Sequence, residues 1–504
     1  MEKFDIVIVG SGLGGLECGA ILSREGYKVL VLEKNKQIGG NLQIFARNKR
    51  IFDTGIHYIG GLGEGQNLNK YFQFLGIMDD LKLQQLDEDG FDVISFEGDE
   101  IEYKHGQGYE NFINIMAGYF PGEREGIIKY CEKIKEVCKS FPMYNLERMN
   151  SHLGSIPFLD VNARDFIAIC TSNKKLQYVL AGSNLLYAGE GDKTPLYVHA
   201  LIINSYIESA WRCVDGGSQI GRLLARKIRD NGGKVLTHAE AKKFIVEDKK
   251  VRHVELADGR TFEADIFISN AHPAVTLDMI DETYIRKAYR KRITSLENSV
   301  SVFILYIVLK KKTIRYFNCN YYHFIDPDVW KGVSYGEQWP AGYALFTGAS
   351  SRDKEYAETM TMMAYMDYNE TKKWEDTFNT VSKESPRGKE YEDFKTERAE
   401  RMFDELEKRF PGIREHTEAY YTSTPLTYRD YIGTKDGSLY GVTKDYRNPM
   451  KSFISPRTKI SNLLLTGQNL NMHGVLGVTI GAITTCSEIL GHDKLMADVA
   501  KYVK

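Results

Sequence analysis

Three features that mark particular classes of protein are absent from this sequence of 504 residues. Its 66 basic side chains are matched by 68 acidic ones, so it lacks the positive excess typical of nucleic-acid binding. No apolar run reaches the roughly 18 residues of a membrane-spanning helix. The seven cysteines are scattered and include no CxxC pair, so neither a disulfide framework nor a metal site is indicated. We therefore expect no nucleic-acid partner and no bound metal.

A leader pattern is also missing. The opening segment MEKFDIVIVGSG runs directly into an apolar strand, with no basic stretch followed by an apolar region. Together with the scattered cysteines, this predicts a protein that is made and kept in the reducing cytoplasm.

The composition that is present is ordinary for a globular protein, with 42% apolar and 27% charged residues. A chain of this length predicts two structural domains. Aromatic residues make up 12% of the chain, with 31 Tyr and 24 Phe. This content suits either a bulky core or a large apolar cavity.

The first forty residues carry the clearest motif. The segment FDIVIVGSGLGGLECGAILSREGYKVLVLEKN predicts a strand, a tight turn, a helix and a second strand. Gly10, Gly12 and Gly15 form G-x-G-x-x-G at the turn, which allows close approach of a pyrophosphate to the start of the helix. Glu33 follows the second strand, where an acid accepts hydrogen bonds from ribose hydroxyls. The unit predicts a dinucleotide site but does not separate FAD from NAD.

Three observations favour FAD, and the third lies near the C-terminus. Gly39 and Gly40 follow Glu33 closely, where flavoproteins with two dinucleotide folds often carry G-G-R; Asn41 replaces the arginine. The chain also has no second strand–GxGxxG–helix unit that could hold NAD(P). NAD(P)H is therefore expected at most as a transient electron donor.

A similar pattern recurs near the C-terminus. Leu463 to Leu465 predict a strand that ends at Gly467-Gln468, and an apolar helix is expected from about Val475. Such a helix start can face a flavin ring, and its partial positive charge can stabilise the anionic reduced ring. The alternative is a plain C-terminal strand–helix unit.

With these pieces joined, the chain resembles the FAD-dependent phytoene desaturase and carotenoid isomerase superfamily, and within it the retinol saturase-like branch. The most specific stretch runs from Trp211 to Pro273, with a GG-start helix, a strand, a β-meander and a closing SNAHP. The segment STPLTYRDYIGTKDGSLYG, Ser423 to Gly441, is similar to the stretch that precedes the last flavin strand in this family. FDTGIHYIG, Phe52 to Gly60, looks like the retinol-saturase-like members.

The resemblance implies where the cofactor lies. The loop from Gly55 to Gly60 should run past the isoalloxazine ring, and Ala241 falls where the family places a backbone contact to adenine. Binding should be non-covalent, because no Cys or His lies in an obvious flavinylation motif. The residues expected to hold FAD are Gly10, Ser11, Gly12, Gly14, Gly15, Glu33, Lys34, Gly39, Gly40, Asn41, Gly55, Ile56, His57, Ala241, Gly467, Gln468, Gly474, Leu476 and Gly477.

The resemblance also implies an α/β fold in which two domains are interleaved. A Rossmann-like, two-dinucleotide-fold FAD domain would comprise residues 1–75, 212–290 and 425–504. An α+β substrate domain would comprise residues 76–211 and 291–424.

Three stretches are candidates for the wall of a substrate site. They are Leu180 to Trp211, Val300 to Phe346, and Ala357 to Glu370 with its four methionines; core filling is the alternative for each. The charged run that begins at Lys372 predicts a solvated helical face.

The function expected is that of a flavin-dependent oxidoreductase acting on a C–C double bond of an apolar polyene or isoprenoid lipid. In saturation, one carbon takes a hydride and an acid protonates the other. His57 and His473 are the candidate acids, and an anionic reduced flavin would favour their charged forms. Either histidine could instead only pack or form a hydrogen bond. Asp53 is expected to be structural, capping local backbone N–H groups.

Several alternatives stay open. The same scaffold could desaturate a carotenoid or isomerise it between cis and trans forms. A related fold escorts prenylated proteins without a flavin, and amine oxidation fits the SNAHP and FDTGIHYIG segments poorly. A water-insoluble substrate implies peripheral contact with a membrane surface. The substrate, the direction of reaction and the oligomeric state do not follow from the sequence.

Overall fold

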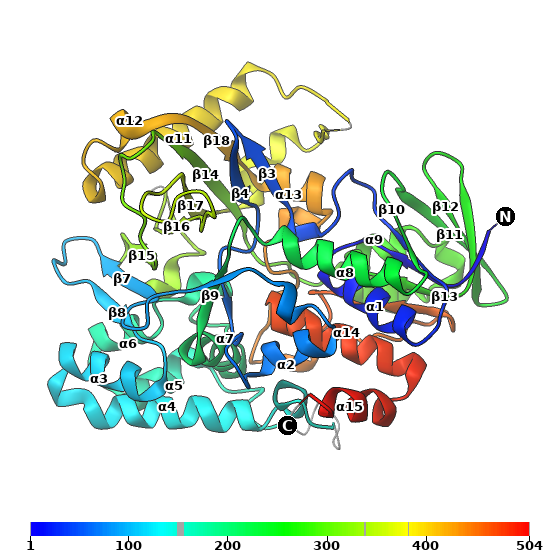
Figure 1. Cartoon of the computed structure of the whole chain (residues 1–504), viewed down its shortest axis with the longest axis horizontal. Coiled ribbons are helices and arrows are strands. Elements are labelled where there is room, and N and C mark those ends of the chain that lie inside the picture. The colour runs from blue at the N-terminus through cyan, green and yellow to red at the C-terminus, as the bar shows by residue number, and fades with distance from the viewer. Residues whose placement is uncertain (1, 149–155, 337–338, 382, 503–504) are drawn as a thin grey trace.

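Two large sheets and the helices around them form the protein. The computed structural model describes residues 2–148, 156–336, 339–381 and 383–502. In Figure 1 the first sheet lies at the right, the second at the upper left, and α3 to α6 lie below the second sheet. A small sheet is formed by β5 (Ile59–Gly60), β9 (Ala210–Cys213) and β6 (Leu83–Gln85).

The first sheet is built around β1, which pairs in parallel with β2 on one side and β13 on the other. Its strands, in spatial order, are β10 (Lys234–Leu236), β2 (Val29–Leu32), β1 (Lys3–Val9), β13 (Thr261–Ser269), β12 (Lys250–Leu256) and β11 (Ala241–Glu247), with β19 (Leu463–Leu465) also parallel to β13. The apolar runs Ile6–Val9 of β1 and Val29–Leu32 of β2 are explained by burial on both faces. The predicted β-meander is confirmed in β11 to β13.

Helix α1 (Leu13–Arg24) fixes the geometry at the end of β1. It packs against α8 (Ser218–Asp230) and α14 (Gly474–Leu490). The predicted N-terminal strand–turn–helix–strand and the C-terminal strand–helix unit are both confirmed. The N-termini of α1 and α14 consequently lie at the same edge of the first sheet.

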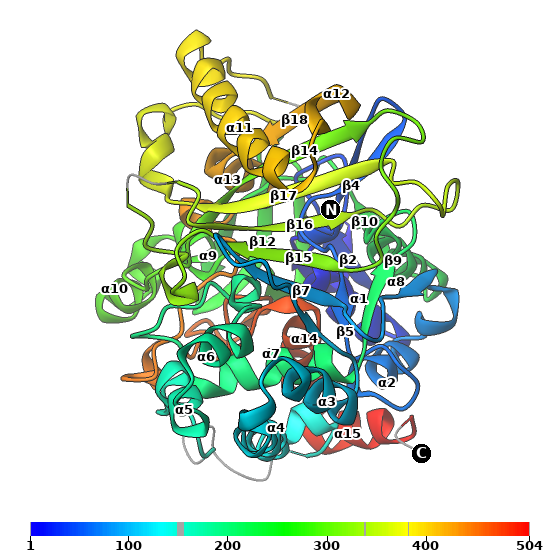
Figure 2. The same ribbon diagram turned by 90° about the vertical axis from the view of Figure 1, so that its left-hand side faces the viewer.

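The second sheet is seen with its strands side by side in Figure 2. Its strands, in spatial order, are β18 (Thr417–Ser423), β14 (Ser301–Leu309), β17 (Thr359–Met366), β16 (Gly342–Thr347), β15 (Asn320–Phe324), β7 (Asp92–Phe96) and β8 (Tyr103–His105). Every residue of β14 is buried, as the sequence predicts. Because side chains alternate along a strand, Phe303 and Leu305 pack under α11 (Lys389–Arg409), whereas Val302 and Tyr306 face the opposite side.

Helix α11 contains much of the charged run that was expected to be a solvated face. It is charged on its outer side, but it buries Met402, Phe403 and Leu406 against the sheet. The helical layer on the other side comprises α3 (Tyr109–Tyr119), α4 (Arg124–Lys139), α5 (Ala163–Cys170), α6 (Lys174–Leu180) and α7 (Leu196–Glu208). Among the residues described, no helix is both long and apolar enough to cross a membrane.

Candidate active site

A cavity of about 400 Å³ lies where the two sheets meet. On one side it is lined by the turns that follow β1, β2, β13 and β19, the carboxyl ends of parallel strands. Open α/β sheets bind their ligands at this edge. On the other side it is lined by residues of β16 and β17 from the second sheet.

Most of the residues predicted to hold the cofactor line this cavity. They are Gly10, Ser11, Gly12, Gly14, Glu33, Lys34, Gly39, Gly40, Asn41, Gly55, Ile56, His57, Ala241, Gly467, Gln468 and Gly474, and His473 joins them. Gly15 lies behind the wall, where a Cβ would come within 2.1 Å of the carbonyl oxygen of Gly10. It therefore brings α1 close to β1 and does not face the cavity.

The glycine turn forms a narrow cradle against Asn270, which belongs to the SNAHP segment. Gly10 has φ +96, a conformation that favours glycine. A Cβ on Gly12 would lie 2.7 Å from Nδ2 of Asn270, and one on Gly467 would lie 2.6 Å from its Oδ1. The SNAHP motif was recognised in the sequence, but no role was predicted for this asparagine. The structure places Asn270 between the two glycine turns.

Glu33 is held at the cavity edge. Its carboxylate accepts hydrogen bonds from the backbone N–H (3.2 Å) and the hydroxyl of Ser11, and from the backbone N–H of Asn35 (2.8 Å). It is only 5% exposed. Lys34 donates to the carbonyl oxygen of Asp430 at 2.9 Å, and burial lowers the pKa of its amine. The acid is thus fixed beside the glycine cradle, as binding of a ribose requires.

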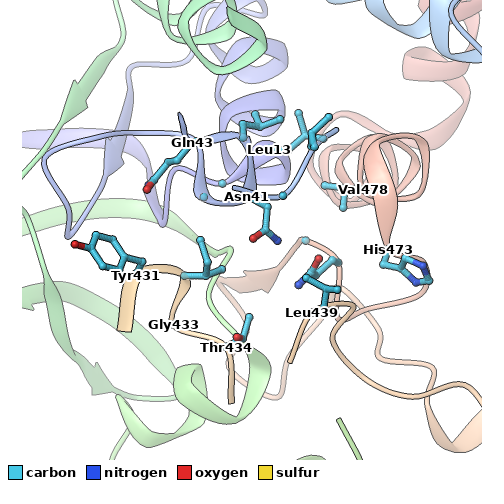
Figure 3. A pocket seen from close by; sticks show the side chains of 18 of the residues that line it. Leu13, Asn41, Gln43, Tyr431, Gly433, Thr434, Leu439, His473 and Val478 are labelled. Carbon is cyan, nitrogen blue, oxygen red and sulfur yellow. The ribbon is translucent and has the colours of Figure 1, made fainter. Parts of the chain in front are cut away.

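Several buried polar atoms around the cavity have no hydrogen-bond partner among the described residues. They are Oδ1 of Asn41, Oδ1 of Asn469, Nε2 of His57 and Nε2 of His473. In the view of Figure 3, Asn41 lies between Tyr431 at one end of the labelled side chains and His473 at the other. Buried polar groups without partners are uncommon and suggest a polar ligand. The glycine cradle, the fixed acid and these atoms fit a flavin dinucleotide.

Burial favours the neutral form of both candidate acids, whereas the anionic reduced flavin of the sequence-based prediction would favour the charged form. Burial, reinforced by the charge of Arg212, lowers the pKa of His57 to about 3, and its ring stacks on Phe346 at 4.4 Å. Burial, reinforced by Lys444, lowers the pKa of His473 to about 4. With nearby positive charge and little solvent, both imidazoles are poor proton donors here.

Asp53 has the structural role expected, with a different partner. It does not cap local backbone, because its Oδ1 accepts from the N–H of Gly217, 164 residues away, at 2.7 Å. The contact joins the end of β4 (Arg50–Asp53) to the start of α8. Burial raises the pKa of Asp53 to about 7.

The second-sheet side of the cavity is aromatic and aliphatic, and the sequence did not predict which residues compose it. Its aromatic side chains include Tyr58, Tyr206, Tyr322, Phe346, Tyr365 and Tyr440. Of the four methionines in the stretch 357–370, Met363 lines the cavity, while Met360, Met362 and Met366 pack under α11. The alternation along β17 is the signal that could have separated them.

A second cavity of about 170 Å³ adjoins the first. Both are lined by Leu186, Tyr206, His473, Gly474 and Val475. The second is mainly apolar and draws several of its lining residues from α7. Leu476 and Gly477, expected at the flavin, line this second cavity instead of the first.

Within the part of the chain that the structure describes, one group of possible metal ligands occurs elsewhere. Glu97, His323 and Glu405 bring ligand atoms within 4.8 Å of one another. Lys408 forms ion pairs with both glutamates, so a cation already balances them. The absence of a bound metal remains a prediction.

Comparison with known proteins supports the class that fold and site define. A family model described as a NAD(P)-binding Rossmann-like domain matches residues 8–75. The crystal structure of an oxidoreductase from Methanosarcina mazei superposes with a TM-score of 0.63 and 16% identity, over 95% of this chain and 99% of that chain. This likeness shows the fold, and the predicted fold class is confirmed. The chain is a flavin-dependent oxidoreductase.

Curated relatives then confirm the resemblance seen in the sequence. The all-trans-retinol 13,14-reductase of Rattus norvegicus is 28% identical, over 97% of this chain and 86% of its own length. Prolycopene isomerase 2, chloroplastic, of an Oncidium hybrid cultivar is 26% identical, over 98% of this chain and 85% of its own length. The chain is thus a homologue of these two proteins over nearly all of its given sequence.

Proposed function

We propose that this protein uses non-covalently bound FAD to saturate a C–C double bond of an apolar polyene or isoprenoid lipid. The observation that carries the proposal is the composition of the main cavity. One side has the glycine cradle and Glu33 of a dinucleotide site, and the other side has the aromatic wall of the second sheet. A reductase of all-trans-retinol among the relatives supports the polyene class.

The chain's residues have distinct parts in this proposal. Glu33 would bind the ribose of the dinucleotide, and the N-terminus of α1 would hold its pyrophosphate. The Gly55–His57 loop and the start of α14 would hold the ring. A bound flavin supplies hydride chemistry. Of the described residues that line either cavity, none is a cysteine, which supports non-covalent binding. In this scheme NAD(P)H acts at most as a transient donor, because the sequence has no second dinucleotide unit.

The apolar walls exclude water and suit a substrate with few polar atoms. The second cavity provides room for a long hydrocarbon chain next to the first. Such a substrate has to be collected from a bilayer, so we propose weak, peripheral membrane contact. With a net charge of −2, binding to vesicles should depend little on salt.

Isomerisation of a carotenoid is the second candidate. It is favoured by the prolycopene isomerase among the full-length relatives. A non-enzymatic lipid escort would not need a ribose-binding acid or a pyrophosphate cradle, and the presence of both argues against that alternative.

Product analysis tests the proposal. FAD-loaded protein, reduced without oxygen, is mixed with all-trans-retinol or with prolycopene, and the products are analysed by mass spectrometry. Saturation predicts a product that has gained two hydrogens and lost one conjugated double bond. A product of unchanged mass with altered geometry would favour isomerisation. Recovery of both polyenes unchanged would contradict the proposal.

A further inference from the structure

Three side chains form a hydrogen-bonded chain that starts at the wall of the main cavity. Tyr322, on β15, and Tyr58, directly before β5, both line the cavity, and their hydroxyls lie 2.7 Å apart. The Tyr58 hydroxyl also lies 2.9 Å from Oδ2 of Asp92, on β7. The chain therefore links the cavity to a buried carboxyl group.

Asp92 is fully buried and has partners on both oxygens. Its Oδ1 accepts from the side-chain amide of Asn320 at 2.8 Å, and its Oδ2 accepts from the hydroxyl of Ser183 at 3.0 Å. Asn320 in turn accepts from the guanidinium of Arg212 at 2.7 Å. Burial raises the pKa of Asp92 to about 7, although Asn320, Tyr58, Ser183 and Arg212 act in the opposite direction.

The other titratable groups around Asp92 do not supply a competing acid. His105 on β8 lies opposite Asp92 in the ladder, and burial lowers its pKa to about 4. Burial raises the pKa of Cys319 to about 11, and raises that of Tyr206, on α7. Asp92 is thus the group of this cluster that changes protonation near neutral pH.

The donor–acceptor direction of these hydrogen bonds depends on whether Asp92 holds a proton. An ionised Asp92 accepts from Tyr58, which then accepts from Tyr322, so the hydroxyl protons face away from the cavity. A protonated Asp92 donates to Tyr58, and Tyr58 donates to Tyr322. The Tyr322 hydroxyl is then free to donate into the cavity.

We propose that Tyr322 is the proton donor to the substrate carbon and that Tyr58 and Asp92 resupply its proton. The inference rests on the proposed function. It also provides a proton donor, which His57 and His473 do not provide while they are held neutral. Tyr322 lies in the correct region, because its ring is edge-on to Phe346 at 6.3 Å and Phe346 stacks on His57.

The step balances. One alkene carbon gains a hydride from a reductant of the flavin class, and the π electron pair forms a bond from the other carbon to the Tyr322 proton. Tyr322 takes the Tyr58 proton, and Tyr58 takes that of Asp92. Asp92 is left as a carboxylate, which Asn320 and Ser183 stabilise by hydrogen bonds. It must regain a proton before the next turnover.

The pH dependence follows with a definite sign. Below pH about 7, Asp92 is protonated and the hydrogen bonds from Asp92 through Tyr58 to Tyr322 are directed into the cavity. Above pH about 7, the direction of these hydrogen bonds is reversed. The rate of saturation should therefore fall as the pH rises through about 7 in the wild type. In Asp92→Asn this fall should be lost, because the amide has no titratable proton.

The kinetic test uses FAD-loaded protein and all-trans-retinol. Tyr322→Phe should lower kcat by ~10²–10⁴-fold, the range for a lost general acid, with little change in KM. The control is Tyr321→Phe, the next residue of β15, whose ring lies against Arg409 and lines neither cavity. It should keep the wild-type kcat and pH profile. A wild-type kcat in Tyr322→Phe would overturn the inference.

A second readout does not depend on turnover. Infrared difference spectra between the wild type and Asp92→Asn report the carboxylic acid C=O band of Asp92 and separate it from that of Asp53. A band that is present below neutral pH and disappears above it supports the donor chain. If Asp92 is ionised throughout, the inference is wrong.

The two readouts distinguish failure of the inference from failure of the proposed function. A wild type that leaves all-trans-retinol unchanged contradicts saturation of that polyene. The infrared titration then tests the Asp92–Tyr58–Tyr322 donor chain independently of turnover. The band below neutral pH supports the donor chain, and the absence of the band overturns it.

Discussion

His57 lies with its ring parallel to Phe346, and its Nε2 has no partner among the described residues. Its sequence neighbours placed it beside the flavin, but the sequence did not reveal how completely it is buried. Burial and Arg212 remove the charge that a proton donor at neutral pH requires. The residue is therefore better suited to packing and to a neutral hydrogen bond with the cofactor.

We expect His57→Gln to weaken FAD binding without changing the pH profile of turnover. Loss of the stacked pair with Phe346 costs about 0.5–1.5 kcal/mol, which corresponds to at most about tenfold in the dissociation constant of FAD. Fluorescence titration of apoprotein with FAD measures this change. His416→Gln, in α12 (Ile413–His416), is the control and should bind FAD as the wild type does. Unchanged FAD affinity with loss of the fall in rate above neutral pH would instead make His57 the acid.

Glu33→Ala should release the flavin. The carboxylate lies at the cavity edge with Ser11 and Asn35 as its partners, and its removal leaves the ribose hydroxyls without an acceptor there. The flavin absorbance per protein after gel filtration measures the loss. Glu25→Ala, at the end of α1, is the matched control and should keep its flavin. Full occupancy in Glu33→Ala would refute the assignment of the dinucleotide site.

Among the elements, α1 makes its closest glycine contact at Gly15. A Cβ at position 15 would lie 2.1 Å from the carbonyl oxygen of Gly10, which is backbone and cannot move aside without displacing the turn. Gly118, in α3, has no atom within 4 Å of the corresponding position. The two glycines provide a matched pair of helical positions.

Gly15→Ala should lower the free energy of unfolding by about 1–3 kcal/mol, because α1 must move away from β1. The same change should weaken FAD binding, since the cradle and the helix start move with it. Gly118→Ala should be neutral or stabilising by up to about 1 kcal/mol, through helix propensity. Denaturant unfolding of the apoproteins measures both. Equal stability of the two variants would show that α1 does not need this contact.

The elements also show what the sequence can predict. Local patterns predicted the turn at Gly10, the strand–helix unit of β19 and α14, and the buried strand β14. The aromatic wall was missed because its members meet only in three dimensions. Tyr58 and Tyr322 are 264 residues apart, and Asp92 meets Asn320 across a separation of 228 residues. These contacts depend on the parallel pairing of β7 with β15, which no local pattern specifies.

For the whole molecule, the cavity lies between two sheets assembled from separate parts of the chain. The first sheet uses strands from residues 3–32, 234–269 and 463–465, and the second uses strands from residues 92–105, 301–366 and 417–423. This alternation supports the proposed interleaving of a cofactor domain with a substrate domain. It also brings a dinucleotide site and an apolar wall into one cavity, which is the basis of the functional proposal.

The most direct measurement follows the flavin itself. Purified, FAD-loaded protein is reduced without oxygen and mixed rapidly with all-trans-retinol, while the flavin and polyene absorbances are recorded together. If the flavin saturates the polyene, oxidised flavin should reappear in step with loss of the conjugated polyene, one flavin for each double bond saturated. A flavin that stays reduced in the presence of the polyene, or a protein that stays colourless after FAD is added, would contradict it.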